Sequence, residues 1–151
     1  MITVIHFKME GGVHLSKEPI SLWDRSIDMW MGHRIEISEE ALLYCNNILT
    51  YLEKEQENLW TTIGEDFVAA LQAEFQAGSY GFTDFDCMEV FEESEDINDY
   101  RKHMRLVSIQ FFQTEICDGV FTLYLENNWD EDHSCELVFE NYLFIKDSSI
   151  M

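Results

Sequence analysis

The chain has 151 residues, a length typical of one domain, and 46% of them are apolar and 14% aromatic. Thirty carboxylates against nine Lys and Arg give a net charge of −21. That field repels nucleic acid and anionic membranes and attracts cations and basic proteins, although acidity can also serve solubility alone. The abundant aromatic residues exclude a disordered chain, since highly charged disordered chains contain few of them.

No targeting or metal-binding pattern is visible at the level of the whole chain. The first residues, MITVIHFKMEGG, lack the basic leader and apolar core of a signal peptide, and no apolar run approaches the ~20 residues that span a bilayer. The four cysteines (Cys45, Cys87, Cys117 and Cys135) show no zinc-finger spacing. We expect a cytoplasmic single-domain protein with reduced thiols and no cofactor.

The N-terminal third carries mixed signals. Residues 2–9, ITVIHFKM, predict a strand, and Pro19 prevents a helix from running through its position. In the stretch 20–31, three large apolar residues recur at roughly helical spacing: Trp23, Ile27 and Trp30. The alternation in 33–37, HRIEI, predicts a short strand. The tryptophans, with Trp60, could line a ligand pocket, but core positions explain them more simply.

Two helices are predicted next, over about 38–58 and 62–77. Ser38 is a candidate N-cap for the first helix, which has one apolar stripe: Ala41, Cys45, Ile48, Leu49 and Leu52. Thr62 and Glu65 have the spacing of a capping box for the second helix, and Gly78 is a natural stop. The pair could form a hairpin or one bent helix.

The C-terminal third has the character of a sheet. Four runs have strand length and composition: 106–113, 119–126, 135–140 and 142–147. The loops between them predict an antiparallel meander. The expected fold is therefore α+β: a mostly antiparallel sheet with a C-terminal four-strand meander, covered on one face by the two helices.

The segment 84–100, DFDCMEVFEESEDINDY, is both acidic and apolar, with eight carboxylates in seventeen residues and no Lys or Arg. Charge speeds association with a cationic protein, and apolar residues supply desolvated anchors. We therefore interpret it as a partner-binding surface, with these candidates: Asp84, Phe85, Asp86, Glu89, Phe91, Glu92, Glu93, Glu95 and Asp96. The alternatives are a solvated face fastened to the core, or local neutralisation by the basic cluster 101–105, RKHMR.

Catalytic templates are missing: the sequence contains no GxSxG, no glycine-rich phosphate loop and no HExxH, which predicts that the protein is not an enzyme. Asp130, Asp132 and His133 could hold a divalent metal in the loop 126–135, although the order does not match an EF-hand. A polar hairpin loop with Trp129 tucked against the sheet is the simpler interpretation. Cys135 beside His133 is read as a packed thiol.

The string 123–139, LYLENNWDEDHSCELVF, resembles the C-terminal hairpin of an uncharacterised bacterial family in which Trp-Asp-x-Glu-His-Gly joins two apolar strands. Trp129, Asp130 and His133 match that motif, whereas Asp132 replaces its Glu and Ser134 its Gly. The resemblance implies a hairpin and no particular activity. In size, charge and composition the chain also resembles small acidic immunity proteins that neutralise bacterial toxins.

These observations favour an acidic protein-binding module, an immunity or inhibitor protein that occludes the cationic surface of a basic partner such as a toxin nuclease domain. Its expected partners include neither nucleic acid nor membrane. Two alternatives remain open at this point: a divalent-metal-binding protein that uses the loop 130–133, and a housekeeping domain whose acidity has no specific partner.

Overall fold

The computed structural model describes residues 7–32, 35–81, 85–130, 132 and 134–145. It confirms the α+β class, with eight strands and four helices in this part of the chain. The strands are β1 (Phe7–Glu10), β2 (Val13–Ser16), β3 (Ile20–Leu22), β4 (Arg25–Gly32), β5 (Met104–Phe111), β6 (Phe121–Asn127), β7 (Cys135–Glu140) and β8 (Leu143–Phe144). The helices are α1 (Glu39–Lys54), α2 (Gln56–Gln76), α3 (Phe85–Glu93) and α4 (Ile97–Arg101).

The strands form one sheet in the order β1-β2-β4-β5-β6-β7-β8, with β3 paired to β4. Among the strands that the structure describes, only β4 and β5 run parallel, and all four helices lie in the connection between them. The predicted meander is confirmed as β5 to β8, with antiparallel pairing at each step. Its last strand is shorter than the predicted run 142–147, of which 146 and 147 lie outside the described residues.

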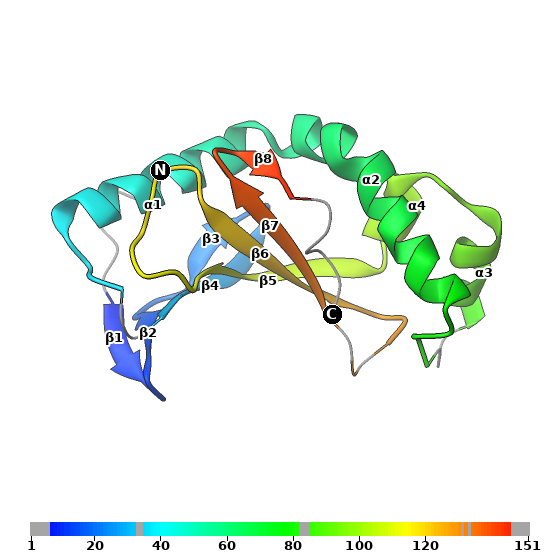
Figure 1. Ribbon diagram of the computed structural model, residues 1–151, viewed down its shortest axis with the longest axis horizontal. Helices are drawn as coiled ribbons and strands as arrows, with labels where there is room; N and C mark the ends of the chain where they lie inside the picture. The colour runs from blue at the N-terminus through cyan, green and yellow to red at the C-terminus, as the bar shows by residue number, and fades with distance from the viewer. Residues whose placement is uncertain (1–6, 33–34, 82–84, 131, 133, 146–151) are drawn as a thin grey trace.

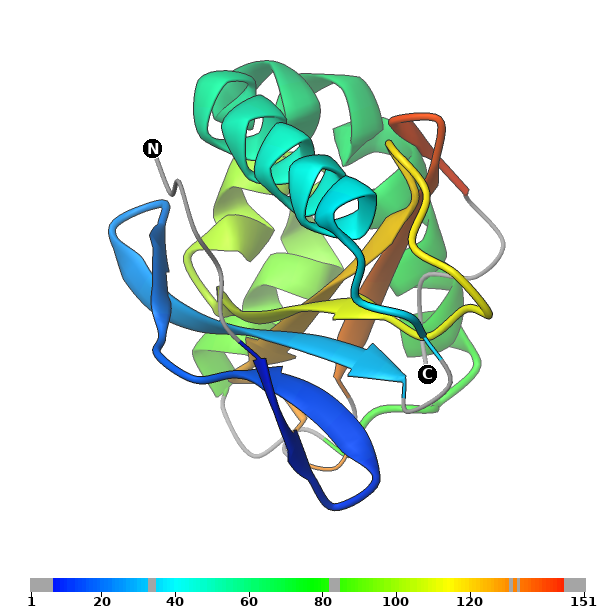
Figure 2. The ribbon, with the colours of Figure 1, turned by 90° about the vertical axis from the view of Figure 1, so that its left-hand side faces the viewer.

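The helices α1 and α2 run across one face of the sheet, as predicted (Figures 1 and 2). Alternate strand residues are buried, for example Ile27, Met29 and Met31 in β4 and Leu123 and Leu125 in β6. The residues between them on β6 are only half-buried. The opposite face of the sheet is therefore the more open one, as the two-residue period of a half-covered strand requires.

The first helix follows its sequence signals closely. The hydroxyl oxygen of Ser38 accepts a hydrogen bond from the amide of Ala41 at 3.1 Å, so Ser38 is the N-cap. All five residues of the predicted apolar stripe are buried. The helix then runs into α2 with a bend at Glu55, which settles the choice between a hairpin and a bent helix. The Leu52 carbonyl near the bend accepts a hydrogen bond from the Trp23 indole at 2.8 Å.

The predicted start of the second helix at Thr62 is wrong. The helix α2 begins at Gln56, and Thr62 lies inside it with its hydroxyl donating to the Asn58 carbonyl at 2.8 Å. The predicted stop is confirmed, because Gly78 has a φ of +74° directly after the last turn. The amide of Gly78 donates to the Phe75 carbonyl and that of Ser79 to the Glu74 carbonyl, which is the Schellman arrangement.

The structure resolves one mixed N-terminal signal and corrects one prediction. The stretch 20–31, whose signals were mixed, is a β-hairpin, and its two-residue turn places both Trp23 (φ 54°) and Asp24 (φ 58°) in the left-handed region. Such a turn matches the right-handed twist of the flanking strands. Residues 35–37 are not a strand, and the Ile35 amide donates a hydrogen bond to the Gly32 carbonyl. Residues 1–6 and 33–34 lie outside the described part of the chain.

Candidate functional site

The carboxylates are gathered into one segment of the chain. Residues 55–100, here called the acidic segment, contain thirteen Asp and Glu and no Lys or Arg. These 46 residues carry a net charge of −13, about twice their proportional share of the total of −21. They form α2, α3, α4 and the connections between them, at the right-hand end of the molecule in Figure 1. The excess negative charge is therefore concentrated on one helical part of the fold.

The helix α3, at the centre of the predicted surface, has a charged side and an apolar side. Asp86, Glu89, Glu92 and Glu93 are exposed. Cys87 and Phe91, one helical turn apart, are buried. The stretch 84–100, which could have been helix or loop, thus consists of α3 and the short α4 joined by residues 94–96. Six of its carboxylates face solvent, as a contact surface for another molecule requires: Asp86, Glu89, Glu92, Glu93, Glu95 and Asp96.

The prediction that Phe91 serves as an exposed anchor is wrong. Its side chain is 3% exposed and lies at the centre of an aromatic cluster. The ring centroids of Tyr100, Trp129 and Phe75 lie 5.0, 5.3 and 5.3 Å from its own. Phe91 therefore fastens α3 to α2, α4 and the end of β6. The other predicted anchor, Phe85, begins α3, and its side chain lies outside the described residues, as does Asp84.

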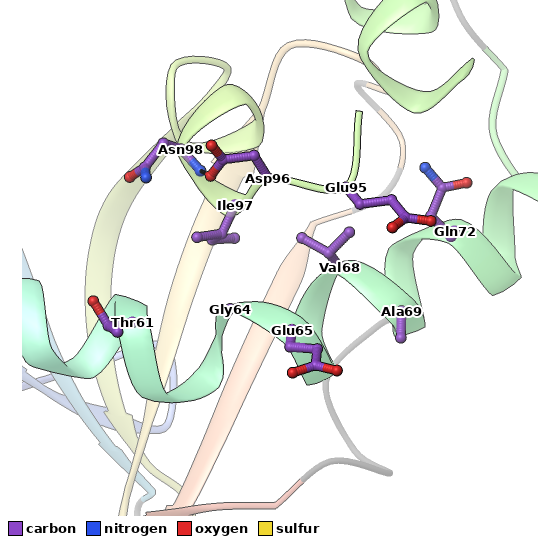
Figure 3. Close-up of a pocket in the computed structure, with 10 residues that line it drawn as sticks. All are labelled: Thr61, Gly64, Glu65, Val68, Ala69, Gln72, Glu95, Asp96, Ile97 and Asn98. Atoms are coloured by element: carbon purple, nitrogen blue, oxygen red, sulfur yellow. Dashed lines mark hydrogen bonds between the residues drawn. The ribbon is translucent and has the colours of Figure 1, made fainter. Parts of the chain in front are cut away.

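A groove of about 620 Å³ lies between α2 and the start of α4 (Figure 3). Its apolar lining comes from both elements: Gly64, Val68 and Ala69 of α2 and Ile97 of α4. Three carboxylates line it as well: Glu65 of α2, and Glu95 and Asp96 before α4. The groove thus combines an apolar lining with negative charge. Glu95 and Asp96 were predicted from the sequence, whereas Glu65 and the apolar lining were not.

The groove depends on a close approach of the two helices at Gly64. A Cβ atom built on this glycine would lie 2.7 Å from Cγ2 and 3.0 Å from Cβ of Ile97. Real Cβ atoms do not approach other carbons so closely, so any larger residue must displace the Ile97 side chain. Glycine at this position inside a 21-residue helix is therefore required by packing, not by backbone conformation.

Gln72 ties the end of α3 to α4 beside the groove. Its side-chain amide donates to Tyr100 Oη at 2.6 Å and to the Phe91 carbonyl at 2.7 Å, with a longer 3.4 Å contact to the Ser94 carbonyl. The Tyr100 hydroxyl in turn donates to the Ser94 carbonyl at 2.7 Å. One side chain of α2 thus fixes the connection that carries Glu95 and Asp96.

Two carboxylates, Asp96 of the connection and Asp99 of α4, have local structural roles. The side chain of Asp96 accepts from the Asn98 amide at 3.0 Å and caps α4. Asp99 accepts a 2.6 Å hydrogen bond from the Ser94 hydroxyl. That hydrogen bond, with a smaller contribution from Lys102, lowers the pKa of Asp99. The lowered pKa keeps Asp99 ionised to a more acidic pH than an isolated Asp.

The basic cluster 101–105 does not neutralise the predicted surface. Arg101 pairs with Glu57 of α2 at 3.1 Å, and Arg105 pairs with Glu126 of β6. Among the described residues, only the pair of Lys102 with Asp99, at 3.5 Å, joins this cluster to a carboxylate of 84–100. Glu89, Glu92 and Glu93 of α3 form no ion pair with any other residue that the structure describes.

The loop 126–135 adopts the polar turn that was the simpler interpretation. The carboxylate of Asp130, 4% exposed, accepts from the amides of Gly81 at 3.1 Å and Asp132 at 2.9 Å. Trp129 is buried against the aromatic cluster, also as expected. No cluster of metal-ligating side chains is found in the described part of the chain, which does not include His133 or Glu131. Burial raises the pKa of the Cys135 thiol to about 12, so it is protonated and a poor nucleophile.

Comparison of the chain with protein-family models, with curated proteins and with solved structures finds no match. None of the described helices is both long enough and apolar enough to cross a membrane.

Proposed function

We propose that this protein is an acidic binding module whose acidic segment docks a basic protein. In the form that the charge pattern supports best, it is an immunity or inhibitor protein for a toxin with a nuclease domain. The observation that supports this proposal is the concentration of thirteen carboxylates and no cations in one helical segment. A charge spread for solubility alone would not need such a distribution.

The charge distribution has a direct consequence for association. Exposed carboxylates on α3 create a negative potential that raises the encounter rate with a cationic surface, at some cost in sensitivity to salt. At 0.1 M salt the Debye length is about 10 Å, so neighbouring carboxylates of one face still act together. A nuclease presents a cationic groove shaped for phosphates, and an array of carboxylates on a rigid helix can occupy or flank that groove.

Charge complementarity raises the association rate and the specificity of binding more than the affinity. A stable complex therefore also needs desolvated apolar contacts. The aromatic cluster around Phe91 cannot supply them, because it is buried. The groove between α2 and α4 can, since the half-buried Ile97 and the exposed Ala69 line it together with Glu65 and Glu95. Its volume of about 620 Å³ admits a long side chain whose methylenes contact the apolar lining while its cation reaches a carboxylate.

Affinity capture from the native host, with mass spectrometry at low and high salt, tests the proposal. Two variant baits with equal net charge distinguish binding at the acidic segment from binding to net charge alone. The segment variant carries Glu65→Gln, Glu89→Gln, Glu92→Gln and Glu95→Gln, and the control variant carries Glu18→Gln, Glu36→Gln, Glu53→Gln and Glu140→Gln. All eight side chains are exposed. We expect the wild type and the control variant, but not the segment variant, to recover the same basic protein at low salt.

Two results would count against the proposal. If no basic protein is recovered at low salt, the acidity has no specific partner and the housekeeping interpretation is favoured. If a basic protein is recovered equally by all three baits, it binds elsewhere or binds to net charge alone. If the recovered partner is a nuclease, an assay of its activity shows directly whether the complex is inhibitory.

A further inference from the structure

A small hollow on the molecule has the opposite character to the acidic segment. It has a volume of about 120 Å³ and lies where the β3–β4 turn, α2 and the start of β5 meet. Three arginines line it: Arg25, Arg101 and Arg105. These are one third of the nine Lys and Arg in the whole chain. In a protein of net charge −21, such a convergence of cations on one hollow calls for a physical reason.

The aromatic side of the hollow is rigid. Trp23 and Trp60 line it with ring centroids 6.1 Å apart. Trp23 has a φ of 54°, a rare backbone conformation for a large residue, and its indole N–H is held by the Leu52 carbonyl. The Arg101 guanidinium lies 5.2 Å from the centre of the Trp60 ring, within the range of a cation–π interaction. The hollow is therefore preformed, with Arg101 held against it.

The existing ion pairs leave the arginines of the hollow able to bind an added anion. Arg101 pairs with Glu57, whose side chain is 78% exposed, and Arg105 pairs with the half-exposed Glu126. Such surface pairs are weak, so a more highly charged anion can compete for either guanidinium. Arg25 is exposed, and its side chain forms no hydrogen bond or ion pair with any other residue that the structure describes. Its guanidinium is available to a ligand without loss of an existing contact.

We infer that this hollow binds a small oxyanion, specifically a phosphate group. Guanidinium groups match phosphate oxygens through paired N–H donors, and three of them favour a doubly charged anion over a singly charged one. The volume of about 120 Å³ is enough to hold one phosphate group. The surrounding negative charge repels a polyanion, so an isolated phosphate group fits better than nucleic acid. This inference does not depend on the docking of a basic protein.

Titration of the purified protein with inorganic phosphate at constant ionic strength and pH 7.5 tests the inference. Emission from the tryptophans reports binding, because two of the four line the hollow. Arg25→Ala is the test variant, since Arg25 is exposed and its loss breaks no described contact. Lys17→Ala is the matched control, because it removes an exposed cation that does not line the hollow.

We expect saturable binding of phosphate that Arg25→Ala weakens by about tenfold or more and Lys17→Ala leaves unchanged. Arg25→Lys, which keeps the charge but loses the fork of donors, serves if Arg25→Ala does not fold, and should also weaken binding. Acetate at equal ionic strength should bind less tightly than phosphate. Absence of saturation, equal affinity for acetate, or unchanged phosphate binding in the Arg25 variants would each overturn the inference.

Discussion

Replacing Gly64 with alanine tests the helix packing that forms the groove. Inside an α-helix alanine is more favourable than glycine by ~1 kcal/mol, so helix propensity alone predicts a more stable protein. The structure predicts the reverse, because the new Cβ would lie 2.7 Å from Cγ2 of Ile97. Overpacking of this kind typically costs ~1–3 kcal/mol. The overpacking outweighs the propensity, and we expect a net destabilisation of about 1 kcal/mol.

Urea denaturation of four proteins measures this balance: the wild type, Gly64→Ala, Ile97→Ala and the double variant. Ile97→Ala removes Cγ2, the nearer of the two colliding atoms, and leaves Cβ at 3.0 Å, so in that background Gly64→Ala should lose most of its cost. Ala69→Gly, at an exposed position of the same helix, gives the local size of the propensity effect. If Gly64→Ala stabilises the protein that contains Ile97 by the full ~1 kcal/mol of propensity, α2 and α4 do not approach as described.

Three further predictions concern other parts of the fold. Trp23→Phe should destabilise the protein by ~1 kcal/mol in urea denaturation, because it removes the indole hydrogen bond at the bend between α1 and α2; an unchanged midpoint would mean that water replaces the indole. Cys117 should be the one thiol that reacts rapidly with a disulfide reagent at pH 8 in the native protein, since the other three cysteines are buried; two or more fast thiols would contradict that burial. The Arg101 guanidinium lowers the pKa of Glu57, so the pair stabilises the fold above the unfolded-state pKa of Glu57 and loses this effect as the pH falls through the lower folded value. Carboxyl NMR titration should show the Glu57 pKa return toward its ordinary value in Arg101→Gln, and an unchanged pKa would refute the pairing.

The local elements of the fold were predictable where one signal dominated. Ser38 before a five-residue stripe specified the start and the buried face of α1, and Gly78 specified the end of α2. The two-residue alternation of the C-terminal runs specified the meander. In each case the residues that decide the structure lie within a few positions of one another, where period and capping are reliable guides.

The errors arose where distant residues decide the structure. The bend at Glu55 lies where the Leu52 carbonyl binds the Trp23 indole, a contact between residues 29 positions apart, and Thr62 gave a false capping signal inside the helix. The spacing of Trp23, Ile27 and Trp30 imitated a helix, whereas the alternation of Ile27 with Met29 and Met31 was the stronger signal. A left-handed Trp23 could not be foreseen from composition.

The candidate site was predicted in its charge and not in its shape. The exposed carboxylates of α3 lie where a partner can reach them, but the side chain of Phe91 is buried in the core. An apolar residue at i+4 from Cys87 in a carboxylate-rich helix indicates an inward stripe as readily as an exposed anchor. The groove joins Gly64 and Ile97, which are 33 positions apart and share no periodic signal. Only the packing of α2 against α4 brings them together.

The salt dependence of the dissociation constant tests the function most directly, measured for the captured basic protein with the wild type, the segment variant and the control variant. Both variants lose the same net charge, so long-range attraction falls equally in both. If the acidic segment is the docking surface, the segment variant should bind about tenfold or more weakly than the control variant and show a shallower loss of affinity with salt. Equal affinities and equal salt slopes for the two variants would contradict a docking role for this segment.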